Sequence, residues 1–297
     1  MANIIITGSK GLIGSHLTKL FKNKNFSYIN FSKLNRNFSS SQNINYFSNI
    51  NIKANYDTLV HLGWCQKLNL FSKKKLIESN IKNTQLLFKI ANSLKIKKFV
   101  FMSTALVYGE KNHEIEIKSK SNLEPNSFYG FQKKEVEEML LKLGKTNKIQ
   151  IIIIRIPLVI SKKSKSLLNK YNKLLKIFNG ECFNNFHNKR SYISEENLIK
   201  NLQLIIEDTD FNKNKIINLF DAPPLSLFEI SKIIQKIERR SNIFEKTFGF
   251  FIGLIFNFIS KAFLKNKINN NFVLSAANQE FKISQGTDIR KKIADTF

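Results

Sequence analysis

A tyrosine and a lysine four residues apart, Tyr129 and Lys133, are well suited to proton transfer. This spacing places both side chains on one face of a helix. A free phenol has a pKa of about 10, and an adjacent ammonium lowers that pKa because it favours the phenolate. Tyr129 can then act as a general acid or base. Thr104 follows the apolar run Lys98–Met102, where its hydroxyl could hydrogen-bond a substrate oxygen.

A glycine-rich turn near the N-terminus indicates a site for binding phosphate groups. Residues 7–14 read TGSKGLIG and lie between an apolar segment, Asn3–Thr7, and an amphipathic one, Leu12–Phe21. In such a turn the first glycine permits a tight bend, the second lets the backbone approach a pyrophosphate, and the third lets the helix pack against the strand. The helix N-terminus offers N–H groups and a partial positive charge to the phosphates. We therefore predict a dinucleotide site formed by Gly8, Lys10, Gly11, Leu12, Ile13 and Gly14.

Apolar runs alternate with helical patterns along the first 160 residues, which is typical of βαβ units and a parallel sheet. Further strands are expected at Tyr28–Phe31, Thr58–Leu62, Lys98–Met102 and Ile149–Ile156, with a short one near Ile44–Tyr46. Helices are expected at Lys74–Leu94 and at Phe128–Leu143, the latter ending at Gly144. These elements predict one doubly wound α/β domain of ordinary size.

Beyond Pro157 the pattern changes. Ser161–Lys176 has leucines at helical spacing, Ile216–Phe220 is expected as a strand and Leu227–Ile237 as a helix. Phe248–Ile259 is apolar but too short to span a bilayer. We interpret it as a core helix, with an interfacial helix on an anionic membrane as the alternative because lysines flank it.

Several segments, in their order along the chain, resemble those of the extended short-chain dehydrogenase/reductases. Within that group the resemblance is to the NAD-dependent epimerase/dehydratase family, which modifies nucleotide sugars. The matching segments are residues 7–14, Asp57–Trp64, Asn80–Thr84, Ser103–Gly109, Tyr129–Lys133 and Arg190–Ile193. Residues 187–197 also resemble reductases and epimerases of surface-polysaccharide pathways.

The resemblance implies the fold and the site. It implies a Rossmann-type doubly wound parallel sheet in residues 1–160, to which 191–239 partly return. A smaller C-terminal α/β substrate domain would comprise 161–190 and 240–297. Thr104, Tyr129 and Lys133 would be the catalytic residues, and Thr104, Tyr129 and Arg190 would bind substrate, Arg190 at the nucleotide diphosphate. Further cofactor contacts would come from Leu62, Gly63, Asn80, Tyr129, Lys133 and Pro157.

Two departures from the family narrow the reaction. The 4,6-dehydratases carry acidic residues directly after the catalytic threonine, whereas Ala105 and Leu106 follow Thr104. The 3,5-epimerase/reductases have a cysteine at the position of Ala105. The expected reaction is therefore hydride transfer at one sugar carbon, C4, which an epimerase or a keto-reductase would perform; the cofactor residues below favour a 4-keto-sugar reductase. A UDP-hexose 4-epimerase with tightly bound NAD is the alternative.

The residues after the second strand bear on the cofactor. NAD enzymes usually present an acidic residue there to the ribose 2′-hydroxyl. This chain has Ser32, Lys33 and Arg36 instead, and Lys10 lies within the glycine turn. These cations favour NADP as the form of NAD(P) bound, and therefore a reductase, because the family's 4-epimerases usually retain NAD. The alternative is that Lys33 and Arg36 are solvated loop residues.

The net charge and the cysteines limit the possible partners and the cellular compartment. The chain of 297 residues has 48 Lys+Arg against 22 Asp+Glu, a net charge of +26. The lysines are spread along the chain, which favours coding bias over a polyanion site, but an RNA- or membrane-binding protein is the alternative from another class. Cys65 and Cys182 lack CxxC spacing, no metal cluster is indicated, and the N-terminus has no signal-peptide pattern. We expect a cytoplasmic homodimer that binds a nucleotide-diphosphate sugar and no specific nucleic acid.

Overall fold

In a computed structural model, the structure describes residues 4–22, 28–31, 56–65, 73–109, 116–161, 187–210, 212–237, 274 and 288–296. The chain divides into two compact units. The first comprises Met1–Val107, Ser127–Arg155 and Asn201–Ile217, and the second comprises Tyr108–Asn126, Ile156–Lys200 and Asn218–Phe297. The strand expected near Ile44–Tyr46, nearly all of Ser161–Lys176, and Phe248–Ile259 lie outside the described residues.

A six-stranded sheet forms the centre of the first unit. Its strands are β1 (Ile4–Thr7), β2 (Tyr28–Phe31), β3 (Thr58–His61), β4 (Lys98–Thr104), β5 (Gln150–Ile156) and β8 (Lys215–Asn218). Their order is β2-β1-β3-β4-β5-β8. β1 pairs in parallel with β2 on one side and β3 on the other, and β3 pairs in parallel with β4. The sheet thus grows outward in both directions from β1, which confirms the predicted doubly wound fold.

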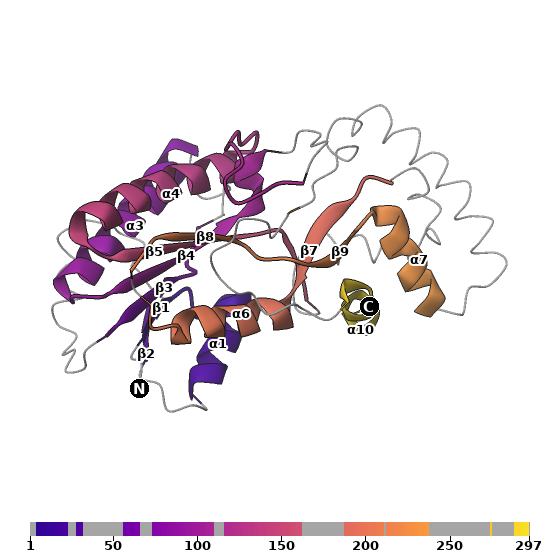
Figure 1. The fold of residues 1–297 in the computed structure, drawn as a ribbon, viewed down its shortest axis with the longest axis horizontal. Coiled ribbons are helices and arrows are strands. Elements are labelled where there is room, and N and C mark those ends of the chain that lie inside the picture. Colours follow the sequence, from indigo (N-terminus) through magenta and orange to yellow (C-terminus); the bar gives the residue numbers. More distant parts are fainter. Residues whose placement is uncertain are drawn as a thin grey trace. The chain divides into compact units, whose positions relative to one another are not determined.

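Helices cover both faces of this sheet. α3 (Lys73–Ser93) and α4 (Phe128–Asn147) lie side by side on one face, and α1 (Leu12–Lys22) lies on the other (Figure 1). α4 begins after Ser127, whose hydroxyl accepts a hydrogen bond from the Gly130 N–H at 3.0 Å.

The predicted end of α4 at Gly144 is wrong, because the helix continues to Asn147. A Cβ at residue 144 would lie 2.3 Å from Cγ1 of Ile151. Gly144 therefore serves the close packing of α4 on β5, and the left-handed Lys148 follows the last helical residue.

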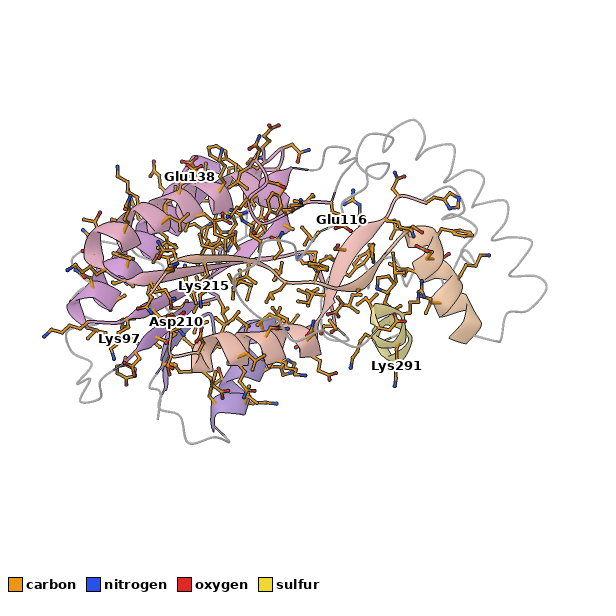
Figure 2. All side chains as sticks on the ribbon, in the orientation of Figure 1. Lys97, Glu116, Glu138, Asp210, Lys215 and Lys291 are labelled. Carbon is orange, nitrogen blue, oxygen red and sulfur yellow. The ribbon has the colours of Figure 1, made fainter. Side chains whose placement is uncertain are left out.

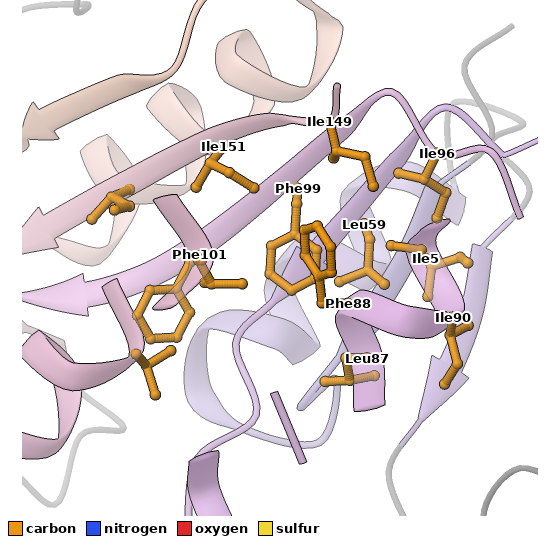
Figure 3. Close-up of a cluster of buried hydrophobic side chains, with 14 of the residues drawn as sticks. Ile5, Leu59, Leu87, Phe88, Ile90, Ile96, Phe99, Phe101, Ile149 and Ile151 are labelled. Carbon is orange, nitrogen blue, oxygen red and sulfur yellow. The ribbon is translucent and has the colours of Figure 1, made fainter. Parts of the chain in front are cut away.

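The core between the sheet and α3 and α4 follows the two-residue period of the strands. Alternate strand residues face these helices, among them Ile5, Leu59, Phe99, Phe101 and Ile151 (Figure 3). Phe88 of α3 packs on Phe99 with ring centroids 6.0 Å apart. Charged side chains such as Lys97 and Glu138, which are 60% and 57% exposed, lie outside this core (Figure 2).

The second unit contains a three-stranded sheet in the order β6-β7-β9. Its strands are β6 (Leu158–Ile160), β7 (Arg190–Ser194) and β9 (Asp221–Leu225). β6 and β7 are parallel, whereas β7 and β9 are antiparallel. Among the described residues, the helices that begin in this unit are α6 (Glu195–Glu207), α7 (Leu227–Ile237) and α10 (Ile289–Thr296). None of the helices over the described residues is long and apolar enough to cross a membrane.

Candidate active site

The carboxyl end of β4 and the first turn of α4 bring the three predicted catalytic residues into one part of the first unit. Thr104 ends β4 and is 7% exposed, and its hydroxyl accepts a hydrogen bond from the Leu106 N–H at 3.3 Å. The 3₁₀ turn η2 (Ala105–Tyr108) follows. A Cβ at Gly130 would lie 2.5 Å from the Leu106 carbonyl oxygen, so glycine at 130 allows α4 to start directly against this turn.

Lys133 is buried, with 3% of its surface exposed, and its ammonium points into the protein. Nζ donates a hydrogen bond to the Met102 carbonyl at 2.7 Å. It lies 3.7 Å from the ring centroid of Trp64, 4.5 Å from that of Phe101 and 5.8 Å from that of Tyr129. The half-buried Tyr129 meets Trp64 edge-on, with ring centroids 6.3 Å apart. The predicted pair is thus assembled, with Nζ of Lys133 beside the Tyr129 ring.

A buried ion pair lies one helical turn beyond Lys133. Glu137 pairs with Arg155 of β5 at 2.6 Å and accepts a hydrogen bond from the Ser103 hydroxyl. Burial lowers the pKa of Lys133 well below its usual value, and the carboxylate of Glu137 acts in the opposite direction. The position of Glu137 therefore helps to keep Lys133 charged.

Sequence reasoning missed Glu137, Arg155 and Ser103. The available signal was that Tyr129, Lys133 and Glu137 recur every fourth residue, which places an acid on the same helix face as the predicted pair.

His61 at the end of β3 adds a second buried polar group. Its Nδ1 lies 2.7 Å from the Thr7 hydroxyl and its Nε2 3.1 Å from the Thr84 hydroxyl. The Thr84 hydroxyl donates its proton to the Asn80 carbonyl, so Nε2 of His61 must be the donor to Thr84 and Nδ1 must accept from Thr7. Burial, followed by the charge of Lys133, lowers the pKa of His61 to about 3. His61 is therefore neutral and ties β1, β3 and α3 together.

The loop after β3 contains the predicted cofactor residues Leu62 and Gly63 and is held by Asn80. The Cys65 N–H donates to Asn80 Oδ1 at 3.1 Å, and Asn80 Nδ2 donates to the Cys65 carbonyl at 3.0 Å. Asn80 Nδ2 also donates to Gln132 Oε1 at 2.8 Å. Asn80 was predicted as a cofactor residue, and its side chain here anchors the loop to α3 and α4.

The glycine turn presents backbone instead of side chains. Gly8 has φ +73°, and a Cβ there would lie 2.5 Å from the Gly63 nitrogen. A Cβ at Gly14 would lie 2.3 Å from the Gly8 carbonyl oxygen, whereas one at the exposed Gly11 would meet only that oxygen, at 3.1 Å. The residues around the N-terminus of α1 therefore fit a dinucleotide pyrophosphate, because side chains are missing where phosphates must come close.

The other predicted site residues are distributed as follows. Lys10 is exposed in the glycine turn, and Leu12 and Ile13 are half-buried at the start of α1. Pro157 and Arg190 belong to the second unit, Pro157 between β5 and β6 and Arg190 as the half-buried first residue of β7. Ser32, Lys33 and Arg36 lie outside the described residues.

A doubly wound sheet with a glycine-rich first turn and a tyrosine–lysine pair beside β4 defines a class, the dinucleotide-binding oxidoreductases of the extended short-chain type. Residues 4–219 match the model of the NAD dependent epimerase/dehydratase family. The chain belongs to this family and is an enzyme of the extended short-chain dehydrogenase/reductase type, as its sequence predicted.

Two curated relatives and one solved structure are similar to this chain. A dTDP-D-glucose 4,6-dehydratase of Dictyostelium discoideum is 29% identical over 266 residues, which cover 77% of this chain but only 59% of that protein. A UDP-glucose 4-epimerase of Vibrio cholerae is 26% identical over 77% of this chain and 73% of its own. The structure of a UDP-glucuronic acid 4-epimerase from Bacillus cereus with UDP-glucuronic acid and NAD superposes with a TM-score of 0.72 at 18% identity. That match covers 99% of this chain and 98% of the other, and at this identity it establishes the fold.

Proposed function

We propose that this enzyme transfers a hydride to or from C4 of a nucleotide-diphosphate sugar, and that it is a 4-keto-sugar reductase of surface-polysaccharide synthesis. The observation that carries the proposal is the grouping of Thr104, Tyr129 and Lys133 at the end of β4. The glycine turn after β1 lies at the same, carboxyl edge of the parallel strands, where ligands of such sheets bind.

Each residue has a defined task in this proposal. A nicotinamide cofactor, when bound, supplies the hydride. Tyr129 gives its phenolic proton to the sugar oxygen in the reductive direction and takes it back in the oxidative one. The Lys133 ammonium favours the phenolate form of Tyr129. The Thr104 hydroxyl orients the sugar oxygen.

The residues after Thr104 support a single hydride transfer over a dehydration. Ala105 is buried and Leu106 is half-buried, and neither carries a group that could remove a proton from carbon or protonate a leaving hydroxyl. This argument separates the chain from the activity named for the Dictyostelium relative.

The second candidate is a nucleotide-sugar 4-epimerase that retains NAD. It is favoured by the Vibrio relative and the Bacillus structure, both named as 4-epimerases. The two candidates need the same groups at C4 but use the cofactor differently. A reductase oxidises NAD(P)H and releases it, whereas an epimerase reduces and reoxidises its bound cofactor within each turnover.

The cofactor discriminates between them. We propose NADP(H), because Lys10 is exposed in the glycine turn and the sequence has Ser32, Lys33 and Arg36 after β2. Titration of the purified protein with NADPH and NADH tests this point. Clearly tighter NADH binding would favour the epimerase.

One experiment separates the two reactions directly. The enzyme is incubated with a UDP-4-keto sugar and NADPH, and in parallel with UDP-glucose and NAD. A reductase consumes the reduced cofactor in step with the loss of the keto sugar. An epimerase interconverts the UDP-hexoses with no net change in cofactor, and this outcome would replace the first candidate by the second.

We also propose a cytoplasmic homodimer. Phe131 of α4 supports association between copies, because it is 45% exposed and is one of two large apolar side chains that are exposed among the described residues. Light scattering of the purified protein decides the oligomeric state, and a Phe131→Glu variant that stays as associated as the wild type would remove this support.

A further inference from the structure

Trp64 is the only tryptophan of the chain and covers the ammonium of Lys133. Its ring centroid is 3.7 Å from Nζ, closer than the rings of Phe101 and Tyr129. Tryptophan has the ring face that attracts cations most strongly, and the attraction grows when the cation is removed from water. With Lys133 only 3% exposed, this contact opposes the effect of burial, which disfavours the charged lysine.

The position of Trp64 is fixed by the anchoring of the residue that follows it and by ring packing. The next residue, Cys65, is bound through both of its backbone groups to Asn80 of α3. Asn80 is itself bound to Gln132 of α4, the neighbour of Lys133. The indole also packs against Phe101 of β4 at a centroid distance of 6.0 Å. The indole face is therefore presented to Lys133 by a preorganised loop.

We propose that Trp64 is a positioning residue that keeps Lys133 protonated and in place beside Tyr129. In the part of the chain that the structure describes, the other charged or titratable groups facing Lys133 are His61 from β3, Tyr129 and Glu137 from α4, and Arg155 from β5 through its pair with Glu137. His61 is neutral, and Arg155 neutralises part of the Glu137 charge. The ring of Trp64 thus supplies stabilisation of the ammonium that these groups do not provide.

The effect of Trp64 on Lys133 can be measured without substrate. Side-chain NMR of lysine-labelled, full-length enzyme follows the protonation of Lys133, whose signal is assigned by its loss in Lys133→Met. Trp64→Leu should lower the proton affinity of Lys133 about tenfold, and Trp64→Phe should lower it less.

The matched control is Phe88→Leu, which removes another ring from the same core away from Lys133 and should leave its proton affinity unchanged. A Trp64→Leu variant with unchanged or raised proton affinity, or a Phe88→Leu variant with the same loss, would overturn the proposal.

A second measurement keeps the test decisive if Trp64→Leu does not fold. All tryptophan fluorescence of the chain comes from Trp64. Its emission should change with pH as Lys133 titrates, and this change should be missing in Lys133→Met. An identical pH response in both proteins would contradict the contact. The importance of this contact for catalysis rests on the proposed function. The two measurements need no substrate, so they can fail while the proposed function holds, and they can succeed while it fails.

Discussion

Tyr129 and Lys133 share a helix face but have different surroundings. Tyr129 is half-buried, whereas Lys133 is buried against Met102 and Trp64. A proton donor must reach a substrate, while the charge that tunes it works best away from water, where electrostatic interactions are strong. The four-residue spacing satisfies both requirements, because Tyr129 lies in the first turn of α4 and Lys133 lies one turn further along the helix.

Removal of the phenolic hydroxyl tests the role of Tyr129. Tyr129→Phe should keep the fold and cofactor affinity but lower turnover about 10²–10⁴-fold, because general acid–base groups typically contribute that much. The matched control is Lys142→Ala farther along the same helix, an exposed position that should leave turnover unchanged. Unchanged turnover of Tyr129→Phe would remove this residue from the mechanism.

The guanidinium of Arg190 tests the nucleotide-sugar assignment. Arginine offers a bidentate fork to phosphate oxygens, so Arg190→Ala should weaken UDP binding at least tenfold and leave NAD(P) binding nearly intact. Calorimetry with the two ligands measures both affinities. Lys189→Ala is the control, because Lys189 is an adjacent, exposed cation whose ion pair with Glu229 is long, at 3.9 Å. Equal UDP binding by Arg190→Ala and wild type would show that Arg190 is only a structural cation.

At the scale of elements, different glycines of the turn serve the stability of the fold and the binding of the cofactor. Gly14 and Gly8 are needed for the turn to close on itself and on the loop after β3, whereas Gly11 faces outward. Gly14 was predicted to let the helix pack against the strand, whereas the nearest atoms that a side chain would meet belong to Gly8 and Ser9 of the turn.

Two substitutions in this turn should therefore behave differently. Gly14→Ala should lower the free energy of unfolding by about 1–3 kcal/mol, the usual effect of overpacking. Gly11→Ala should cost less than about 1 kcal/mol but weaken cofactor binding at least tenfold, because the added methyl occupies the surface that a pyrophosphate approaches. Denaturant unfolding and cofactor titration of both variants check the pattern. The reverse pattern would mean that the cofactor does not approach the turn at Gly11.

At the scale of the whole molecule, His61 couples stability to pH. Its pKa is about 3 in the folded protein and 6.5 as the ordinary value, so the unfolded chain binds more protons between these values. The contribution of neutral His61 is complete above pH 6.5 and is lost as the pH falls toward 3. The slope from this one group is at most about 1.4 kcal/mol per pH unit.

Chemical unfolding across this pH range tests the coupling. His61→Gln should flatten the loss of stability on acidification, whereas His187→Gln, at an exposed position, should retain the wild-type slope. A His61→Gln protein with the wild-type slope would show that other groups cause the acid sensitivity.

The net charge of +26 is also a property of the whole molecule. Family membership and the assembled Tyr129–Lys133 pair favour an enzyme over an RNA-binding protein. A purified protein that retained no cofactor and bound generic RNA in a strongly salt-dependent manner would reverse this preference.

The sequence by itself determined the doubly wound fold, the glycine turn and the pairing of Tyr129 with Lys133. These features depend on local spacing: the strand and helix periods, a turn that needs glycine, and residues four apart on a helix. The sequence also narrowed the reaction through the residues that follow Thr104.

Only the tertiary structure decided what surrounds these residues. Trp64, Asn80 and Arg155 come from three different segments, and nothing in the local pattern places the indole against Lys133 or Arg155 against Glu137. Likewise, Gly144 matched a helix end by local rules, but α4 continues to Asn147, and a side chain at residue 144 would collide with Ile151. Burial and long-range packing set the charge state of Lys133 and His61, because desolvation and neighbouring charges depend on the whole fold.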